Sequence, residues 1–337
     1  MEQQSRFISF SFIRVISCIA VVFLHIFFLA ATYAGINSSE YLVYMSIRNM
    51  FLWSVPCFVM VSGALLLNLN RKMSFKKLFS KYILKVIIAL VVFTVINTVY
   101  SGITDDISAG ETFKSIFVNL FTGSGWPHMW YLYLLIAMYL SLPFFRSFVK
   151  AANRKTFDYM LIMMFIVLSA IPGILSFFNI TSGIYLWTNT IYPLYFLLGY
   201  YLMYQTGPVR KPYLIVAFIL NVLLTVILTA LGKNSIVSVY SFPTIVVSSV
   251  SLFLIFKDFT CHGVVEKILV LVDKTTFGVY LLHLIVLRTL FIILEPNAIG
   301  VVFYGIISFV VSVALTYGYL VVKNLVTERI NSRVITK

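Results

Sequence analysis

Residues 10–33 read FSFIRVISCIAVVFLHIFFLAATY, and this run decides the fold class. Apart from Arg14 and His25 it carries no acidic or basic side chain. About 20 apolar residues in an α-helix suffice to cross a hydrocarbon core of about 30 Å. Similar runs recur along all 337 residues, of which 61% are hydrophobic and 11% charged, with a mean hydropathy of +1.00. This composition excludes a soluble globular protein and predicts an all-α integral membrane protein.

The apolar runs predict about ten transmembrane helices in a single polytopic domain, residues 1–337, with no appended soluble domain. The first run is too long for the apolar core of a signal peptide, so we interpret it as a retained helix. The ten expected spans are residues 10–33, 41–68, 82–102, 128–145, 157–178, 185–204, 211–230, 239–256, 277–294 and 298–322.

The basic residues are divided unevenly between alternate connecting segments. The N-terminus, the C-terminal tail and every second loop together hold 21 of the 25 Lys and Arg residues. Segments rich in Lys and Arg stay in the cytoplasm. Both termini are therefore predicted to be cytoplasmic, and the even number of spans that this requires agrees with ten. The net charge of +14 reflects membrane orientation, so we expect a lipid bilayer as partner and no nucleic acid.

Arg14 and His25 lie eleven residues apart in the first span. At about 100° per residue, eleven steps complete about three helical turns, so the two side chains project from the same face of the helix. A rise of 1.5 Å per residue separates them by about 16 Å along the axis. Arg14 is then expected at the cytoplasmic edge and His25 near the middle of the bilayer. An ionisable side chain at that depth is costly and indicates a functional site.

The second span carries Arg48 and then the segment VPCFVMVSG, residues 55–63. Pro56 frees a backbone carbonyl, and Ser62-Gly63 permits either close helix packing or the approach of a ligand. All eleven acidic residues are expected in loops or near span ends. Arg48 would then bind an anion inside the membrane, or extend to the outer interface.

Two further segments combine polar residues with span ends. His283 and Arg288 fall in the ninth span, while His128, Trp130 and Tyr131 begin the fourth. Each histidine is either a packed, hydrogen-bonded residue or part of a site. The aromatic rings fit an interfacial belt, and they could also stack on a sugar. We include all five residues among the candidates for an acceptor pocket.

A basic segment, residues 71–81, joins the second and third spans. It lies on the anionic inner leaflet or attracts a phosphate-rich cytosolic ligand, and these roles are compatible. Its candidate phosphate-binding residues are Arg71, Lys72, Lys76 and Lys77. The three cysteines have neither metal-binding nor disulfide spacing, and the sequence has no Walker loop, Rossmann loop or zinc signature. We therefore expect no metal and no permanently bound cofactor.

Four motifs in order make the chain resemble acyltransferase family 3, the integral membrane O-acyltransferases. In length, and in lacking an appended domain, it is similar to the stand-alone branch, of which the O-acetyltransferase of enterobacterial common antigen is an example. The motifs are an Arg and a His eleven residues apart, Val-Pro-x-Phe-x-x-x-Ser-Gly, His-x-Trp-aromatic-Leu and Gly-x-Tyr-Leu-x-His, matched by Arg14 and His25, Val55–Gly63, His128–Leu132 and Gly278–His283.

The chain departs from the family pattern in three places. Family members usually carry Asp three residues before the helix-one Arg, and here that position is Ser11. An acidic residue at that end of the site is therefore missing or supplied from elsewhere. The residue after Ser-Gly is Ala64 instead of an aromatic residue, and Arg48 lies about one turn farther from Val-Pro than usual.

The resemblance implies transfer of an acyl group, acetyl before others, from cytosolic acetyl-CoA to a hydroxyl of a cell-surface polysaccharide or its lipid-linked precursor. The expected location is the bacterial cytoplasmic (inner) membrane. His25 would be the general base, and Arg14 with the basic segment would hold the CoA phosphates. The acceptor would meet Arg48, Ser62 and the candidates of the fourth and ninth spans.

Other interpretations of the sequence stay open. Ten helices with interior Arg and His residues also suit a transporter of an anionic glycan precursor or metabolite, although paired intramembrane carboxylates are not expected here. A membrane sensor or scaffold would leave the buried arginines unexplained. The sequence leaves open direct transfer or a covalent acyl-histidine relay, the acyl chain, the acceptor and the oligomeric state.

Overall fold

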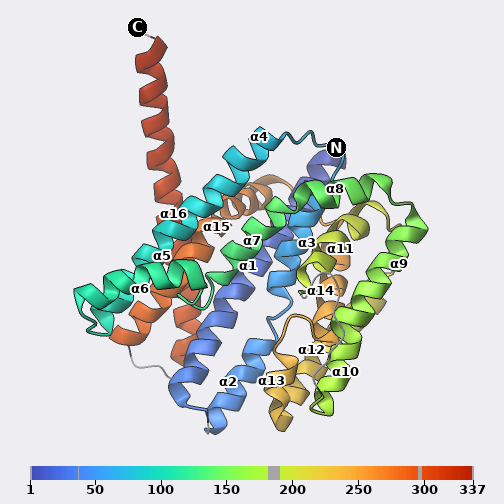
Figure 1. The fold of residues 1–337 in the computed structure, drawn as a ribbon, viewed down its shortest axis with the longest axis horizontal. Coiled ribbons are helices and arrows are strands. Elements are labelled where there is room, and N and C mark those ends of the chain that lie inside the picture. The colour runs from blue at the N-terminus through green and yellow to red at the C-terminus, as the bar shows by residue number, and fades with distance from the viewer. Residues whose placement is uncertain (1, 37, 181–189, 295–297, 336–337) are drawn as a thin grey trace. The chain divides into compact units, whose positions relative to one another are not determined.

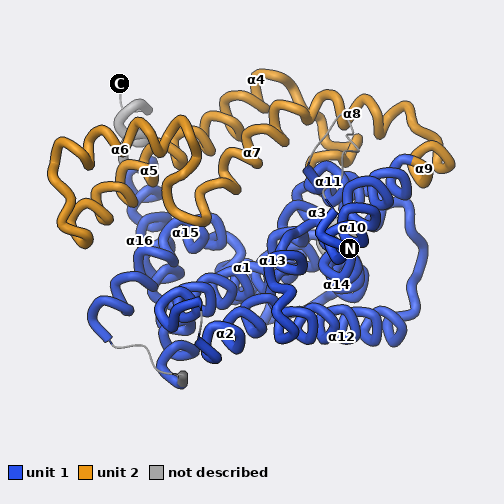
Figure 2. The backbone as a smooth tube through the Cα atoms, turned by 60° about the horizontal axis from the view of Figure 1, so that its bottom comes forward, with its two compact units in different colours: residues 1–64, 160–337 blue, residues 65–159 orange. Residues whose placement is uncertain are grey.

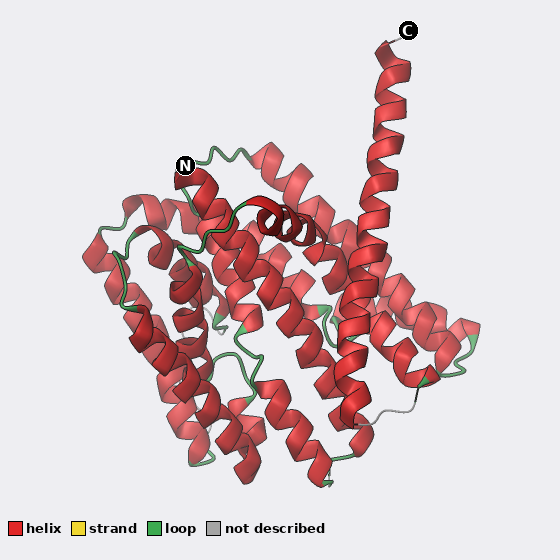
Figure 3. Cartoon of the chain, turned by 180° about the vertical axis from the view of Figure 1, so that it is seen from behind, coloured by secondary structure: helices red, strands yellow, loops and turns green. Residues whose placement is uncertain are grey.

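The computed structural model describes residues 2–36, 38–180, 190–294 and 298–335 (Figure 1). These residues form α-helices with three short π-helical segments, and no strand occurs among them, as Figure 3 shows. The all-α prediction is confirmed. The chain divides into two compact units, residues 1–64 with 160–337 and residues 65–159 (Figure 2). The prediction of one functional domain over residues 1–337 stays a prediction, because compactness alone does not define a functional domain.

The first unit contains α1 and its neighbours. Within it α1 packs against α2, α14, α15 and α16, while α12 packs against α2 and α14. Its elements are α1 (Glu2–Ala34), α2 (Ser39–Asn49), α3 (Ser54–Leu66), α9 (Arg154–Phe165), η2 (Ile166–Ala170), α10 (Ile171–Phe177), α11 (Tyr192–Tyr204), α12 (Lys211–Leu228), η3 (Thr229–Lys233), α13 (Asn234–Val237), α14 (Pro243–Phe256), α15 (Gly263–Ile293) and α16 (Ala298–Ile335), with α3 and α9 crossing its boundaries.

The second unit is smaller. In it α5 packs against α6 and α7, and α7 also contacts η1 and α8. Its elements are α4 (Phe75–Lys77), η1 (Leu78–Ile83), α5 (Leu84–Thr104), α6 (Ala109–Thr122), α7 (Trp130–Leu140) and α8 (Leu142–Ala151).

The helices confirm a multi-pass membrane protein, while the count of ten stays a prediction. Among the described residues, seven helices are long and apolar enough to cross a membrane, or eight if the bent pair α7–α8 forms one span. The bend between α7 and α8 is 51°. The shorter apolar helix α14 lies in the predicted span 239–256. Helix α11 lies in the predicted span 185–204, of which residues 185–189 are outside the described residues. The cytoplasmic location of the termini also stays a prediction.

The second predicted span, residues 41–68, is broken in its first half. Helix α2 ends at Asn49, a turn follows, and α3 begins at Ser54. The break precedes Pro56, which cannot donate a backbone hydrogen bond and whose ring collides with the carbonyl four residues earlier. The predicted disturbance at this proline therefore appears as an interruption of the helix.

Helix α3 packs unusually close to α11. A Cβ atom added to Gly63 would lie 1.9 Å from the backbone oxygen of Phe196, and one added to Gly199 would lie 1.8 Å from that of Met60. Only glycine permits this backbone approach. Of the two roles open for Ser62-Gly63, the geometry therefore assigns helix packing to the glycine.

Several helices extend beyond the apolar spans, and this changes the environment of one acidic residue. Helix α15 begins at Gly263, whereas residues 257–276 were expected to form a loop. The added turns carry apolar residues at helical spacing together with charges, so the apolar run alone underestimates the helix. Asp273 consequently lies on α15 and is 8% exposed. Asp273 is therefore a helical residue four positions before the predicted ninth span, where a loop was expected.

Candidate active site

Helices α1 and α15 meet along a line of polar contacts in the first unit. Ser11 and Arg14 contact Asp273, the Cys18 thiol lies 3.8 Å from the Thr276 carbonyl oxygen, and His25 contacts His283. Residue numbers increase together on both helices, so the two helices run parallel. We call Ser11, Arg14, His25, Asp273 and His283 the polar seam. Because Arg14 and His25 both face α15, their predicted position on one face of α1 is confirmed.

One end of the polar seam is an ion pair. Arg14 donates from Nε to Asp273 Oδ1 at 2.6 Å and from Nη2 to Oδ2 at 2.5 Å, a bidentate arrangement. Ser11 Oγ donates to Oδ2 at 2.8 Å. The side chain of Arg14 is 23% exposed and that of Asp273 6%. A buried carboxylate with a bidentate arginine and a hydroxyl donor has its charge well compensated.

The other end of the polar seam is a pair of histidines. His283 Nε2 lies 3.2 Å from His25 Nδ1, and the ring centroids are 5.0 Å apart. Each ring also contacts the carbonyl oxygen four residues earlier on its own helix, at 2.9 Å for His25 Nδ1 with Val21 and 3.0 Å for His283 Nδ1 with Val279. His283 is fully buried, whereas His25 is only partly buried.

These contacts assign the protons of the two neutral rings. A carbonyl oxygen only accepts, so Nδ1 carries the proton in both His25 and His283. Nε2 of His283 then has a lone pair and accepts from His25 Nδ1. The lone pair of His25 therefore lies on Nε2. His25 can act as a base from this atom, while His283 holds the ring from the opposite side.

Arg48 lies near His25 at the end of α2. Its charge is within electrostatic reach of the His25 ring, and its Nη1 donates to Asn49 Oδ1 at 2.7 Å. Asn49 is held in turn by Nδ2 contacts with Thr229 Oγ1 at 2.8 Å and with Asn234 Oδ1 at 2.9 Å. No described carboxylate pairs with Arg48, and its buried Nε has no hydrogen-bond partner among the described residues. This arrangement suits an anion or a developing negative charge.

Two other candidates of the first unit lie outside the polar seam. Ser62 donates from Oγ to the Phe58 carbonyl oxygen at 2.9 Å, a bond within its own helix. Arg288 follows His283 by five residues, which is about 140° around α15. The two side chains therefore project from different faces of α15, and of the two it is His283 that contacts His25.

The candidates of the fourth span belong to the second unit. His128 is buried and its ring meets that of Trp126 at a centroid distance of 6.3 Å, while Trp126 Nε1 donates to Ser101 Oγ at 3.0 Å. Trp130 and Tyr131 pack edge to face, with centroids 6.0 Å apart. The motif is thus a packed aromatic group at the start of α7. Its contact with an acceptor stays a prediction.

The basic segment also lies in the second unit. Lys72, Lys76 and Lys77 are exposed, and the Arg71 guanidinium donates to the Tyr82 hydroxyl. Arg146 secures the start of this segment by donating to the backbone oxygens of Leu66, Asn68 and Arg71. The segment has the exposed positive charge that a phosphate ligand needs, and its role in binding CoA stays a prediction.

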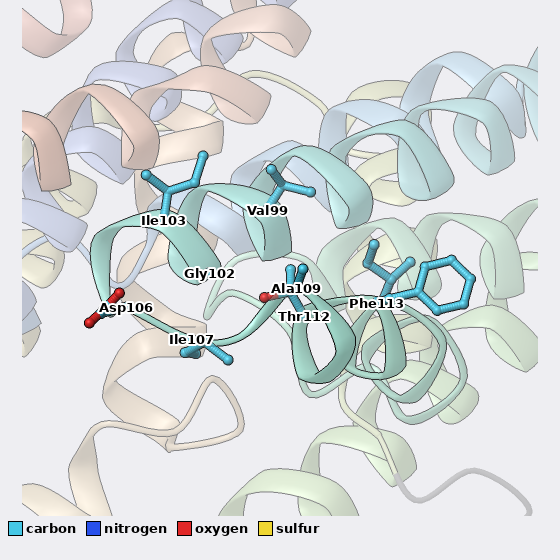
Figure 4. A pocket seen from close by; sticks show the side chains of 9 residues that line it. Val99, Gly102, Ile103, Asp106, Ile107, Ala109, Thr112 and Phe113 are labelled. Carbon is cyan, nitrogen blue, oxygen red and sulfur yellow. The ribbon is translucent and has the colours of Figure 1, made fainter.

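An open pocket of about 580 Å³ lies between α5 and α6 in the second unit. Figure 4 shows that apolar side chains such as Val99, Ile103 and Phe113 dominate its wall, with the Asp106 carboxylate and the Thr112 hydroxyl as its polar groups. It contains none of the candidate residues, so it adds nothing to the site that the sequence predicts.

Comparison with protein families decides what kind of protein this is. The family model described as "Acyltransferase domain" matches residues 7–317, which cover all of the second compact unit and most of the first. The chain belongs to acyltransferase family 3. The resemblance inferred from the four motifs is confirmed at this level, and the protein is an acyltransferase. Neither the search of curated proteins nor the search of solved structures found a match.

The sequence did not single out two residues of this acyltransferase. Asp273 was not a candidate because its segment was expected to form a loop. The available signal was its spacing: Asp273 precedes His283 by ten residues, and Arg14 precedes His25 by eleven. Asn49 was not a candidate because an asparagine next to an arginine matches no sequence motif. In the described residues no group of three or more metal-ligating side chains occurs.

Proposed function

We propose that this acyltransferase moves an acetyl or related acyl group from cytosolic acyl-CoA to a hydroxyl of a cell-surface polysaccharide or its lipid-linked precursor. The polar seam is the observation that carries the proposal, with an arginine at one end and a histidine pair at the other. Eleven residues of helix separate Arg14 from His25 by about 16 Å. That spacing suits a donor with phosphates at one end and a thioester at the end of a long arm.

In the proposed reaction the acceptor hydroxyl oxygen attacks the thioester carbonyl carbon. His25 Nε2 takes the hydroxyl proton as the new C–O bond forms. The C–S bond then breaks, and the imidazolium returns its proton to the leaving sulfur, which gives free CoA and the ester. Throughout, His25 Nδ1 keeps donating to the Val21 carbonyl and to His283 Nε2. These two acceptors stabilise the imidazolium without any carboxylate.

The Arg48 guanidinium is the proposed electrostatic partner of this step. It is positively charged, held by Asn49 and within reach of the His25 ring. Such a group stabilises the negative charge on the carbonyl oxygen in the tetrahedral intermediate, or the charge of an anionic acceptor. An acceptor linked to a lipid pyrophosphate would supply that negative charge. The proposed setting is the bacterial inner membrane, as for the enterobacterial common antigen O-acetyltransferase.

The direct test is His25→Ala in membranes that receive labelled acetyl-CoA and the native envelope glycans. Loss of a general base lowers the rate by about 10²- to 10⁴-fold. His262 is exposed, caps the start of α15 and is not part of the polar seam, so His262→Ala is the matched control. Labelled glycan should nearly disappear in the first variant and be unchanged in the second. Undiminished labelling with His25→Ala would disprove the role of His25.

CoA binding separates the enzyme from a transporter of anionic glycan precursors. Purified protein in detergent should bind CoA saturably, because the donor site is part of the enzyme. An exporter has no reason to bind CoA. Protein that is folded and does not bind CoA would count against acyl-CoA as the donor and would favour transport.

A further inference from the structure

Asp273 is the carboxylate of the polar seam, and it has no part in the reaction as proposed. Its two oxygens receive bonds from Ser11 Oγ and from two nitrogens of Arg14. We propose that Asp273 is a positioning residue that orients Arg14 for the phosphates of the donor. The inference rests on the proposed function, since it assumes an acyl-CoA donor.

The geometry divides the Arg14 guanidinium into two edges. Nε and Nη2 face Asp273, and a guanidinium has five N–H groups in one plane. The Nη1 protons and the second Nη2 proton point away from this carboxylate. Among the described residues Asp273 is the hydrogen-bond acceptor of Arg14, so the outer edge is available to a phosphate. Bidentate recognition of phosphate requires such a fixed edge.

Without Asp273 the arginine would not keep this orientation. An unpaired charge within an apolar span is costly, and a long side chain relieves the cost by extending to the interface. Arg14 is 23% exposed, so it has a route to do so. Removing the carboxylate also removes a repulsion toward phosphate. The loss of orientation outweighs this gain, because a displaced guanidinium no longer reaches the donor with two bonds.

The hydrogen bond of Ser11 suggests how to move the carboxylate without losing it. Ser11 Oγ lies 2.8 Å from Asp273 Oδ2 and one helical turn before Arg14. A carboxylate introduced at position 11 would therefore lie beside the same guanidinium. In S11D/D273N the charge is transferred from α15 to α1, and the amide at position 273 can donate to it. A role in positioning Arg14 needs the carboxylate, and it does not need the carboxylate to come from α15.

The experiment measures the dissociation constant for acetyl-CoA of purified protein in detergent, together with the acetyl-transfer rate at saturating donor. D273N should weaken binding at least tenfold while changing the saturated rate less than threefold. S11D/D273N should restore binding to within threefold of the unmodified protein. Asp258 is exposed before α15, so D258N is the charge-matched control and should bind normally.

Each outcome decides between positioning and a merely structural pair. Folded D273N with unchanged donor affinity overturns the proposal, as does S11D/D273N that folds and still binds as weakly as D273N. If D273N does not fold, the double variant alone decides, because it retains the carboxylate. Failure of the double variant to fold also contradicts the proposed equivalence of the two positions. If the unmodified protein does not bind acetyl-CoA, the proposed function fails, and not this inference alone.

Discussion

Replacement of His283 distinguishes a ring that positions His25 from one that performs the chemistry itself. His283→Leu removes the acceptor at Nε2, 3.2 Å from His25 Nδ1, and leaves the 2.9 Å contact of His25 with the Val21 carbonyl. One neutral hydrogen bond contributes about 1 kcal/mol, which corresponds to a loss of roughly five- to tenfold in rate. His25→Ala, by comparison, should cost about 10²- to 10⁴-fold. The assay is transfer of labelled acetyl groups in membranes, normalised to the amount of folded protein.

His283→Gln is the matched control for this prediction. The amide oxygen of glutamine can accept from His25 Nδ1 near the position of the lost Nε2, so activity should stay within about threefold of the unmodified protein. His283 is fully buried, so thermal unfolding of each variant must be compared as well. A His283→Leu variant that folds and is as inactive as His25→Ala would refute the reasoning. Full activity of His283→Leu would also refute it.

Three further predictions concern packing, a loop and topology. Gly63→Ala should destabilise the protein by about 2–3 kcal/mol in thermal unfolding, because the added Cβ would lie 1.9 Å from the Phe196 backbone oxygen. Gly318 has open space around it, so Gly318→Ala should be neutral or stabilising by about 0.5–1 kcal/mol. Equal effects of the two substitutions would contradict the close approach of α3 and α11. Arg146→Gln should release three backbone carbonyls and speed tryptic cleavage of the basic segment severalfold, and an unchanged cleavage rate would count against it. Burial and the neighbouring Glu266 carboxylate raise the pKa of the Cys261 thiol, so maleimide labelling should be slow at pH 7 and rise roughly tenfold per pH unit below that pKa. The other two cysteines are buried, so an impermeant maleimide should label intact cells only after permeabilisation, and labelling without it would place this loop outside.

The sequence predicts the helical membrane fold because the length of each apolar run and the distribution of Lys and Arg between the loops can both be read without knowing any tertiary contact. The same holds for Arg14 and His25, since helical periodicity alone places both on one face of α1. The contact of His25 with His283 depends instead on how α1 and α15 pack, 258 residues apart in the chain. No local pattern encodes that register.

Asp273 shows a second reason for incomplete prediction. Its segment is charged, so hydropathy assigns it to a loop, although the helix continues through it. The missing carboxylate at Ser11 was visible in the sequence, and the structure shows a carboxylate in contact with that serine. The family pattern thus indicates a position for an acidic residue beside Ser11, and only the contact between α1 and α15 shows that Asp273 lies there.

The central claim is that the donor lies along α1, with its phosphates at Arg14 and its thioester at His25. A structure of the purified protein with bound CoA tests it most directly. We expect the phosphates beside the outer edge of the Arg14 guanidinium and the CoA sulfur next to His25 Nε2. CoA bound with its sulfur away from His25, or with its phosphates away from Arg14, would contradict the claim.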